Sequence, residues 1–142
     1  MFRTPATENR SILITAFNGK VFGTDRTSGT RRWAVEIEAH VGEIELAIES
    51  GVVVACTRNK LAFIDYATGT VLRIVNLVGE FPRRPVMLVD QGQILIARNG
   101  EVACYALSGD ALWLEPFTGQ GFGAVALGLP GNVRQADDVG SK

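Results

Sequence analysis

The sequence predicts an all-β chain that forms part of a β-propeller, with three four-stranded blades. A repeat of 40 residues is visible in the positions of Gly29, Gly69 and Gly109. Each repeat consists of short apolar runs that end at Gly or Asn, which favours strands joined by tight turns. No run shows the 3.6-residue spacing of apolar residues that an amphipathic helix needs. Four antiparallel strands in about 40 residues are typical of a propeller blade.

The first two strands of each repeat are expected to form a hairpin. Branched apolar residues fill 12–16, 52–56 and 94–97, and each run ends at an Asn-Gly or Arg-Asn pair. Asn and Gly readily take the positive φ that a tight hairpin requires. The second strands are then residues 21–24, 61–64 and 102–105.

A turn with Asp, Ser or Thr, and Gly should follow the second strand. Residues 25–29 and 65–69 show the full pattern, and residues 107–109 keep only Leu-Ser-Gly. Asp and Ser side chains bond nearby backbone groups, and Gly takes the left-handed position, so all three repeat glycines are expected at positive φ. A third strand follows and ends near Ile37, Leu77 and Pro116.

A fourth strand lies between repeats, at residues 44–49 and 85–89, where polar and apolar residues alternate or a buried run occurs. The first repeat has no such strand before it, because residues 4–8 are polar and contain a proline. We expect a strand at residues 122–129 to close that first blade, through Phe122, Val125 and Leu127. The propeller domain is then 1–131, and the polar residues 132–142 form a flexible tail.

Three blades are too few for a ring, since propellers have 4 to 8. Two copies give six blades, and two-fold association is the commonest symmetry. The sequence therefore predicts a homodimer that forms a six-bladed ring.

Two of the repeats share a further pattern, an Asp-x-x-Ser/Thr-Gly turn in both and a Trp four residues after the glycine in one of them. This pattern resembles the repeat of quinoprotein-type (pyrroloquinoline-quinone-like) propellers, a family whose members include an outer-membrane assembly lipoprotein. The resemblance covers roughly residues 11–117 and implies that the Trp packs over the turn of the next blade. Arg73 replaces the expected Trp in the second repeat, and the third repeat lacks the Asp. The residues that carry the resemblance are Asp25, Gly29, Trp33, Asp65, Thr68, Gly69, Gly109 and Trp113.

Composition and cysteine usage narrow the class of protein. The formal net charge is -1, so there is no general attraction to nucleic acid or to anionic lipid, and neither is expected as a partner. The polar residues 1–10 do not resemble a secretory signal, which together with two isolated cysteines, Cys56 and Cys104, predicts a cytoplasmic protein with free buried thiols.

No catalytic, cofactor or metal residues are assigned. Residues 119–124 match the dinucleotide pattern Gly-x-Gly-x-x-Ala, but Pro130 prevents the helix that should follow. His40 is the single histidine, and Asp137 and Asp138 lie in the polar tail, so neither is interpreted as catalytic. Quinone enzymes of the resembling family carry a calcium or lanthanide site and an adjacent pair of cysteines, which this sequence lacks.

We therefore expect a non-enzymatic protein-interaction module. Loops and hairpin tips converge on one face of a propeller, where aromatic and Arg residues are typical of interface hot spots. The alternatives are a small-ligand-binding enzyme that uses the central channel, and an inhibitor or chaperone-like partner of one cytoplasmic protein. The predicted partner-binding residues are Arg58, Phe81, Arg83, Arg84, Arg98 and Phe117.

Overall fold

The computed structural model describes residues 9–39, 42–77, 85–98 and 100–136. These ranges contain strands and turns and no helix, and therefore no helix that could cross a membrane. The strands are β1 Ile12–Phe17, β2 Lys20–Asp25, β3 Arg31–Glu36, β4 Glu45–Glu49, β5 Val52–Cys56, β6 Lys60–Asp65, β7 Val71–Asn76, β8 Val86–Asp90, β9 Gln93–Arg98, β10 Glu101–Ala106, β11 Ala111–Glu115, β12 Leu127–Leu129 and β13 Asn132–Arg134.

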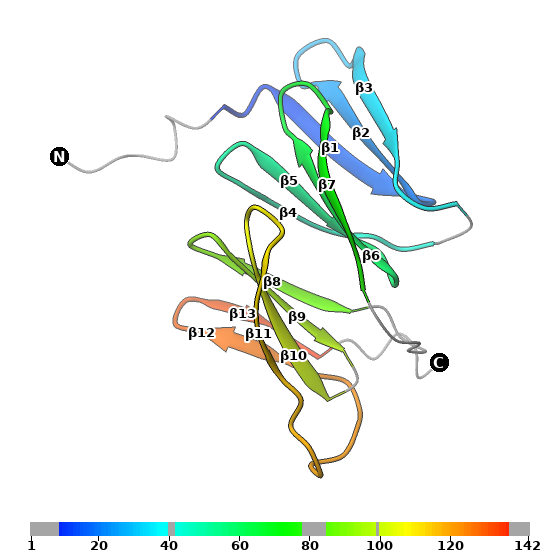
Figure 1. Ribbon diagram of the computed structural model, residues 1–142. Coiled ribbons are helices and arrows are strands. Elements are labelled where there is room, and N and C mark those ends of the chain that lie inside the picture. The colour runs from blue at the N-terminus through cyan, green and yellow to red at the C-terminus, as the bar shows by residue number, and fades with distance from the viewer. Residues whose placement is uncertain (1–8, 40–41, 78–84, 99, 137–142) are drawn as a thin grey trace, which may run out of the picture.

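Three antiparallel sheets follow one another along the chain (Figure 1). The first sheet has the order β1-β2-β3, the second β4-β5-β6-β7, and the third β8-β9-β10-β11. The predicted hairpins, third strands and linking strands are confirmed. Residues 4–8, where the sequence predicts no opening strand for the first sheet, lie outside the described residues. Consecutive strands pair in each sheet because every connection between them is a short turn.

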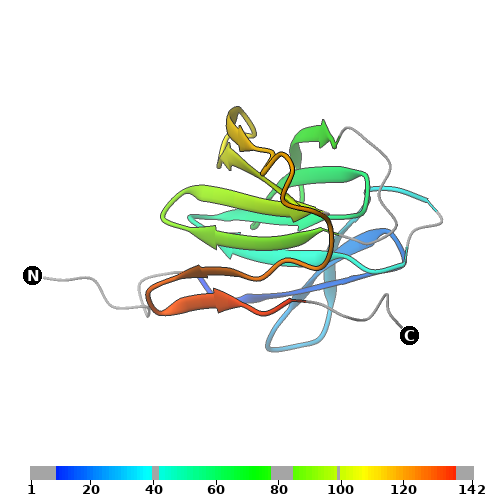
Figure 2. The same cartoon turned by 90° about the horizontal axis from the view of Figure 1, so that it is seen from below.

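The sheets stack face to face (Figures 1 and 2). Buried apolar side chains pack between neighbouring sheets. In β5, Val53 and Ala55 face the first sheet, whereas Val54 and Cys56 face the third. Side chains alternate between the two faces of a strand, so a strand covered on both faces must be apolar throughout. This explains the uninterrupted run of residues 52–56.

The repeat glycines have the predicted backbone conformation. The φ angles of Gly29, Gly69 and Gly109 are 79°, 78° and 97°. In the first turn the Asp25 Oδ1 atom accepts hydrogen bonds from the N–H groups of Thr27 and Ser28, each at 2.9 Å. The Asp65 carboxylate accepts bonds from Thr68 in the same way, so the motif is a structural turn.

The C-terminal segment differs from the prediction. Phe122 lies outside any strand and is 87% exposed, Val125 also precedes the strand, and only Leu127 lies in β12. The predicted tail begins inside β13, which pairs with β12 through a Pro130-Gly131 turn. Leu127 and Leu129 pack on Leu88 and Leu95 of the third sheet, so the hairpin satisfies its apolar residues within the chain.

Candidate interaction surfaces

Trp33 forms the junction between the first and second sheets. Its side chain is 9% exposed, and its Nε1–H donates to the Tyr66 carbonyl at 3.1 Å. A Cβ atom placed on Gly69 would lie 2.5 Å from Trp33 Cγ, so the ring rests directly on the glycine. Tyr66 reaches back to the first sheet, where its hydroxyl donates to the Ile12 carbonyl at 2.6 Å and accepts from the Ile12 N–H at 2.8 Å. The Asp-x-x-Ser/Thr-Gly turn is therefore the surface on which the Trp side chain of the preceding sheet packs.

Arg73 occupies the corresponding place between the second and third sheets. Its guanidinium donates to the Ser108 carbonyl at 3.3 Å and to Asp110 Oδ1 at 2.7 Å. A Cβ atom on Gly109 would lie 2.7 Å from Arg73 Cδ. Arg73 thus covers its glycine as Trp33 does, with its aliphatic stem in place of an aromatic ring.

The outer face of the third sheet points away from the second sheet, and it is only partly covered near the edge strand β11. Trp113 pairs with Cys104 and therefore points to the same face of the sheet. The β12–β13 hairpin covers that face near Leu88, Leu95 and Cys104. Trp113 itself is 48% exposed, so its predicted burial at a junction is wrong for the single chain. A large aromatic side chain is left half-exposed beside a covered core.

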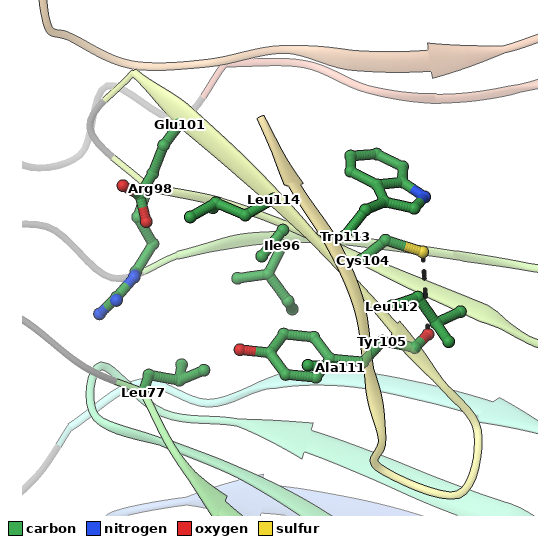
Figure 3. Close-up of a pocket in the computed structure, with 11 residues that line it drawn as sticks. Leu77, Ile96, Arg98, Glu101, Cys104, Tyr105, Ala111, Leu112, Trp113 and Leu114 are labelled. Atoms are coloured by element: carbon green, nitrogen blue, oxygen red, sulfur yellow. Dashed lines mark hydrogen bonds between the residues drawn. The ribbon is translucent and has the colours of Figure 1, made fainter. Parts of the chain in front are cut away.

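A groove of about 380 Å³ runs between the second and third sheets on the other side of β11 (Figure 3). Leu112 and Leu114 line it together with Leu77 and Tyr105, and Arg98 and Glu101 lie at one end. This groove was not predicted from the sequence. Three consecutive large apolar residues at 112–114 were the available signal, because they make both faces of an outer strand apolar.

Arg58 is exposed at the tip of the β5–β6 turn, as a partner-binding residue should be. Glu38 braces this tip, since its Oε1 accepts from Thr57 Oγ1 at 2.8 Å and its Oε2 accepts from Asn59 Nδ2 at 2.7 Å. Hydrogen bonds to both neighbours of Arg58 therefore hold the turn that carries its side chain. Its role in binding stays a prediction.

The other predicted partner-binding residues have different surroundings. Phe117 is 47% exposed just after β11, at the same end of the stack as Arg58, because β5 and β11 both end there. Arg98 is buried, with 8% of its surface exposed, and its desolvation lowers the pKa of the guanidinium. Phe81, Arg83 and Arg84 lie outside the described residues, as do His40, Asp137 and Asp138.

A second recess, of about 210 Å³, lies at the inner edge between β4, β8 and the hairpin. Arg134 of β13 donates to Glu45 Oε1 of β4 at 2.6 Å, and Asn132 donates to the Val89 carbonyl at 3.2 Å. These bonds attach the hairpin to both the second and the third sheets.

The described residues do not fit the cofactor chemistry that the resemblance suggests. Cys56 and Cys104 are buried free thiols in different sheets, which confirms their prediction as unpaired cysteines but does not provide an adjacent pair. Burial raises the pKa of the Cys104 thiol, which disfavours the reactive thiolate. Within the described ranges, no three His, Cys, Asp or Glu side chains lie close enough to hold a metal ion.

Acid is expected to weaken the turns before it affects the core. Hydrogen bonds from the Ser28 and Thr27 N–H groups hold the pKa of Asp25 below 3.8, and Arg73 lowers that of Asp110. Their stabilising contribution is complete above the unfolded pKa and is lost as pH falls through the lower folded value. The urea midpoint should therefore decrease as the pH falls below about 4, and less steeply in Asp25→Asn. Identical pH profiles for the wild type and Asp25→Asn would contradict this.

Solved structures that are similar to the chain include the following three. BamB from Moraxella catarrhalis matches with a TM-score of 0.54 and 20% identity, over 73% of this chain and 32% of that one. A quinohemoprotein alcohol dehydrogenase from Comamonas testosteroni matches with a TM-score of 0.60 and 18% identity, over 73% and 19%. The quinohemoprotein alcohol dehydrogenase ADHIIG from Pseudomonas putida HK5 matches with a TM-score of 0.61 and 18% identity, over 81% and 19%.

No protein-family model and no curated protein matches the sequence. The chain spans less than a third of each of the similar structures. At these identities the likeness shows the fold, and it confirms the predicted resemblance to quinoprotein-type β-propellers at that level. The chain accordingly has an all-β fold of the propeller type, with four-stranded antiparallel sheets.

Proposed function

We propose that this propeller-fold chain is a non-enzymatic protein-interaction module, a half-propeller that assembles into a homodimeric ring and binds a protein partner. The observation that carries the proposal is the set of large apolar side chains exposed along β11 and just beyond it. Leu112, Trp113, Leu114 and Phe117 are each about half exposed. Contiguous exposed apolar residues in a folded domain mark interaction sites.

Fold likeness does not choose between the classes of function, since the similar structures include BamB and two alcohol dehydrogenases. The choice rests on the site. The exposed aromatic and Arg side chains, Phe117 and Arg58, match the composition of protein interfaces. A cytoplasmic location is part of the proposal and fits two buried free thiols.

Quantitative affinity capture from native lysate tests the partner-binding surface. We expect the wild-type protein to retain one protein in stoichiometric amount, and the double variant Arg58→Ala/Phe117→Ala to lose it. Arg10→Ala is the matched control. Arg10 is exposed just before β1 begins, at the end of the stack opposite to Arg58 and Phe117. A partner retained equally by all three proteins, or no stoichiometric partner at all, would overturn this part of the proposal.

A further inference from the structure

The two junctions within the chain repeat one contact. Trp33 covers Gly69, and Arg73 covers Gly109, which in both cases is the glycine 36 residues later. In both, the side chain comes from the outer strand of one sheet and the glycine from the turn of the next. We call the covering side chain the donor of a junction and the glycine turn that it covers the acceptor. The donor lies on one face of a sheet, and the acceptor turn lies on the opposite face of the next sheet.

Trp113 is the third donor, and its place in the described structure is unfilled. It stands 40 residues after Arg73 and, like Trp33, pairs with the middle of the preceding strand. Trp33 is 9% exposed, whereas Trp113 is 48% exposed. The difference is the missing turn, because the hairpin β12–β13 packs on Leu88, Leu95 and Cys104 instead.

Gly29 is the matching acceptor, and no side chain of the described part of the chain covers it. Its φ of 79° equals that of the occupied Gly69 within a degree, and Asp25 caps its turn as Asp65 caps the other. Yet among the described residues nothing would lie within 4 Å of a Cβ atom on Gly29, whereas one on Gly69 would meet the Trp33 ring. The Gly29 turn thus has the conformation of the occupied turn, and none of the described residues covers it.

We propose that Trp113 of one chain docks on the Gly29 turn of a second copy, and that the reverse contact closes the ring. The occupant is a second copy because the same chain carries both halves of the contact in unfilled form, and its internal junctions already show how they fit. Two copies related by a two-fold axis make the contact twice, which leaves neither half empty. By analogy with Trp33 and Tyr66, the Trp113 Nε1–H then donates to the Arg26 carbonyl of the other copy.

This inference rests on the proposed ring, and analytical ultracentrifugation of single-site variants tests it. The wild type should sediment at twice the mass of one chain. Trp113→Ala and Gly29→Asn should each raise the dissociation constant at least about tenfold. Asn is chosen because it tolerates positive φ, so the variant fills the docking surface with little backbone strain.

Matched controls separate docking from general effects. Leu72→Ala removes an apolar side chain that is 55% exposed on β7, the outer strand of the second sheet. Gly51→Asn makes the same exchange at φ 76° in the β4–β5 turn, where a Cβ atom also meets none of the residues that the structure describes. Both controls should remain dimeric, and circular dichroism should show native sheet content in all four variants.

Mixing the two disruptive variants gives the decisive result. Trp113→Ala keeps an intact Gly29, and Gly29→Asn keeps an intact Trp113, so the mixture has one intact junction and should form heterodimers. Dissociation by Trp113→Ala but not by Gly29→Asn would show that the open faces pair with each other and would overturn the inference. A wild-type dimer that neither variant dissociates would overturn it while leaving the ring proposal standing. A wild-type monomer would overturn both.

Discussion

Replacing Trp33 by alanine is expected to lower the free energy of unfolding by about 3 to 5 kcal/mol, the range for a buried Trp or Phe. The ring fills the space between Gly23 of its own sheet and Gly69 of the next, and it carries a hydrogen bond to the Tyr66 carbonyl. Glycines cannot refill this space, because they have no side chains. The variant therefore keeps a cavity at the junction and leaves a buried carbonyl without its donor. Urea unfolding followed by circular dichroism measures the loss.

Trp113→Ala is the internal comparison for Trp33→Ala. Trp113 occupies the equivalent strand position but is half exposed in the single chain, so its removal should lower stability far less when the protein is diluted to the monomer. Arg73→Ala should also cost little, since its ion pair with Asp110 is exposed and exposed pairs contribute about 0 to 1 kcal/mol. Equal losses at positions 33, 73 and 113 would contradict the conclusion that, of these three side chains, only Trp33 is buried at a junction in the single chain.

The strand pattern was predictable because each strand carries its own local signal. Branched apolar runs, Asn-Gly turns and the Asp25 and Asp65 caps act within a few residues, so their consequences do not depend on distant parts of the chain. The fold likeness followed from the same residues. The repeat glycines were predictable for the same reason, and their φ angles confirm the prediction.

The C-terminal segment was mispredicted because a strand in it could pair either with the first sheet or with the residues that follow it in the chain. The alternation of apolar residues in 122–129 indicated a strand but did not specify its partner. Pro130-Gly131 is a good hairpin turn, and Asn132 and Arg134 find hydrogen bonds to β8 and β4, so the chain folds back on itself. A side-chain bond across 89 residues, as between Arg134 and Glu45, has no local signature in the sequence.

The interaction surfaces were only partly predictable for a related reason. Arg58 lies at a hairpin tip, where exposure follows from local structure, and it is exposed. Arg98 has the same position in its repeat but is buried, because it lies beside Glu101 and Tyr105 at the end of the groove. The half-exposed Trp113 could not be recognised from sequence, since its repeat position predicts burial by a following sheet.

Replacing Gly69 by valine should destabilise the protein by more than about 3 kcal/mol, with two separate causes. A branched residue at φ 78° is strained by about 1 to 3 kcal/mol. Its Cβ atom would also lie 2.5 Å from Trp33 Cγ, which forces the indole away from the turn and from the Tyr66 carbonyl. Overpacking of this kind typically adds about 1 to 3 kcal/mol.

Gly29→Val isolates the first cause, because its φ is 79° and a Cβ atom there meets none of the described residues within 4 Å. Both substitutions are best made in the Trp113→Ala background, so that self-association does not affect the measurement. Gly29→Val should then show only the backbone strain, and the difference between the two urea midpoints should give the contact between Trp33 and the turn. If both variants lose the same stability, the ring of Trp33 does not depend on a bare glycine, and the docking contact that joins one sheet to the next is not the source of the stability at this junction.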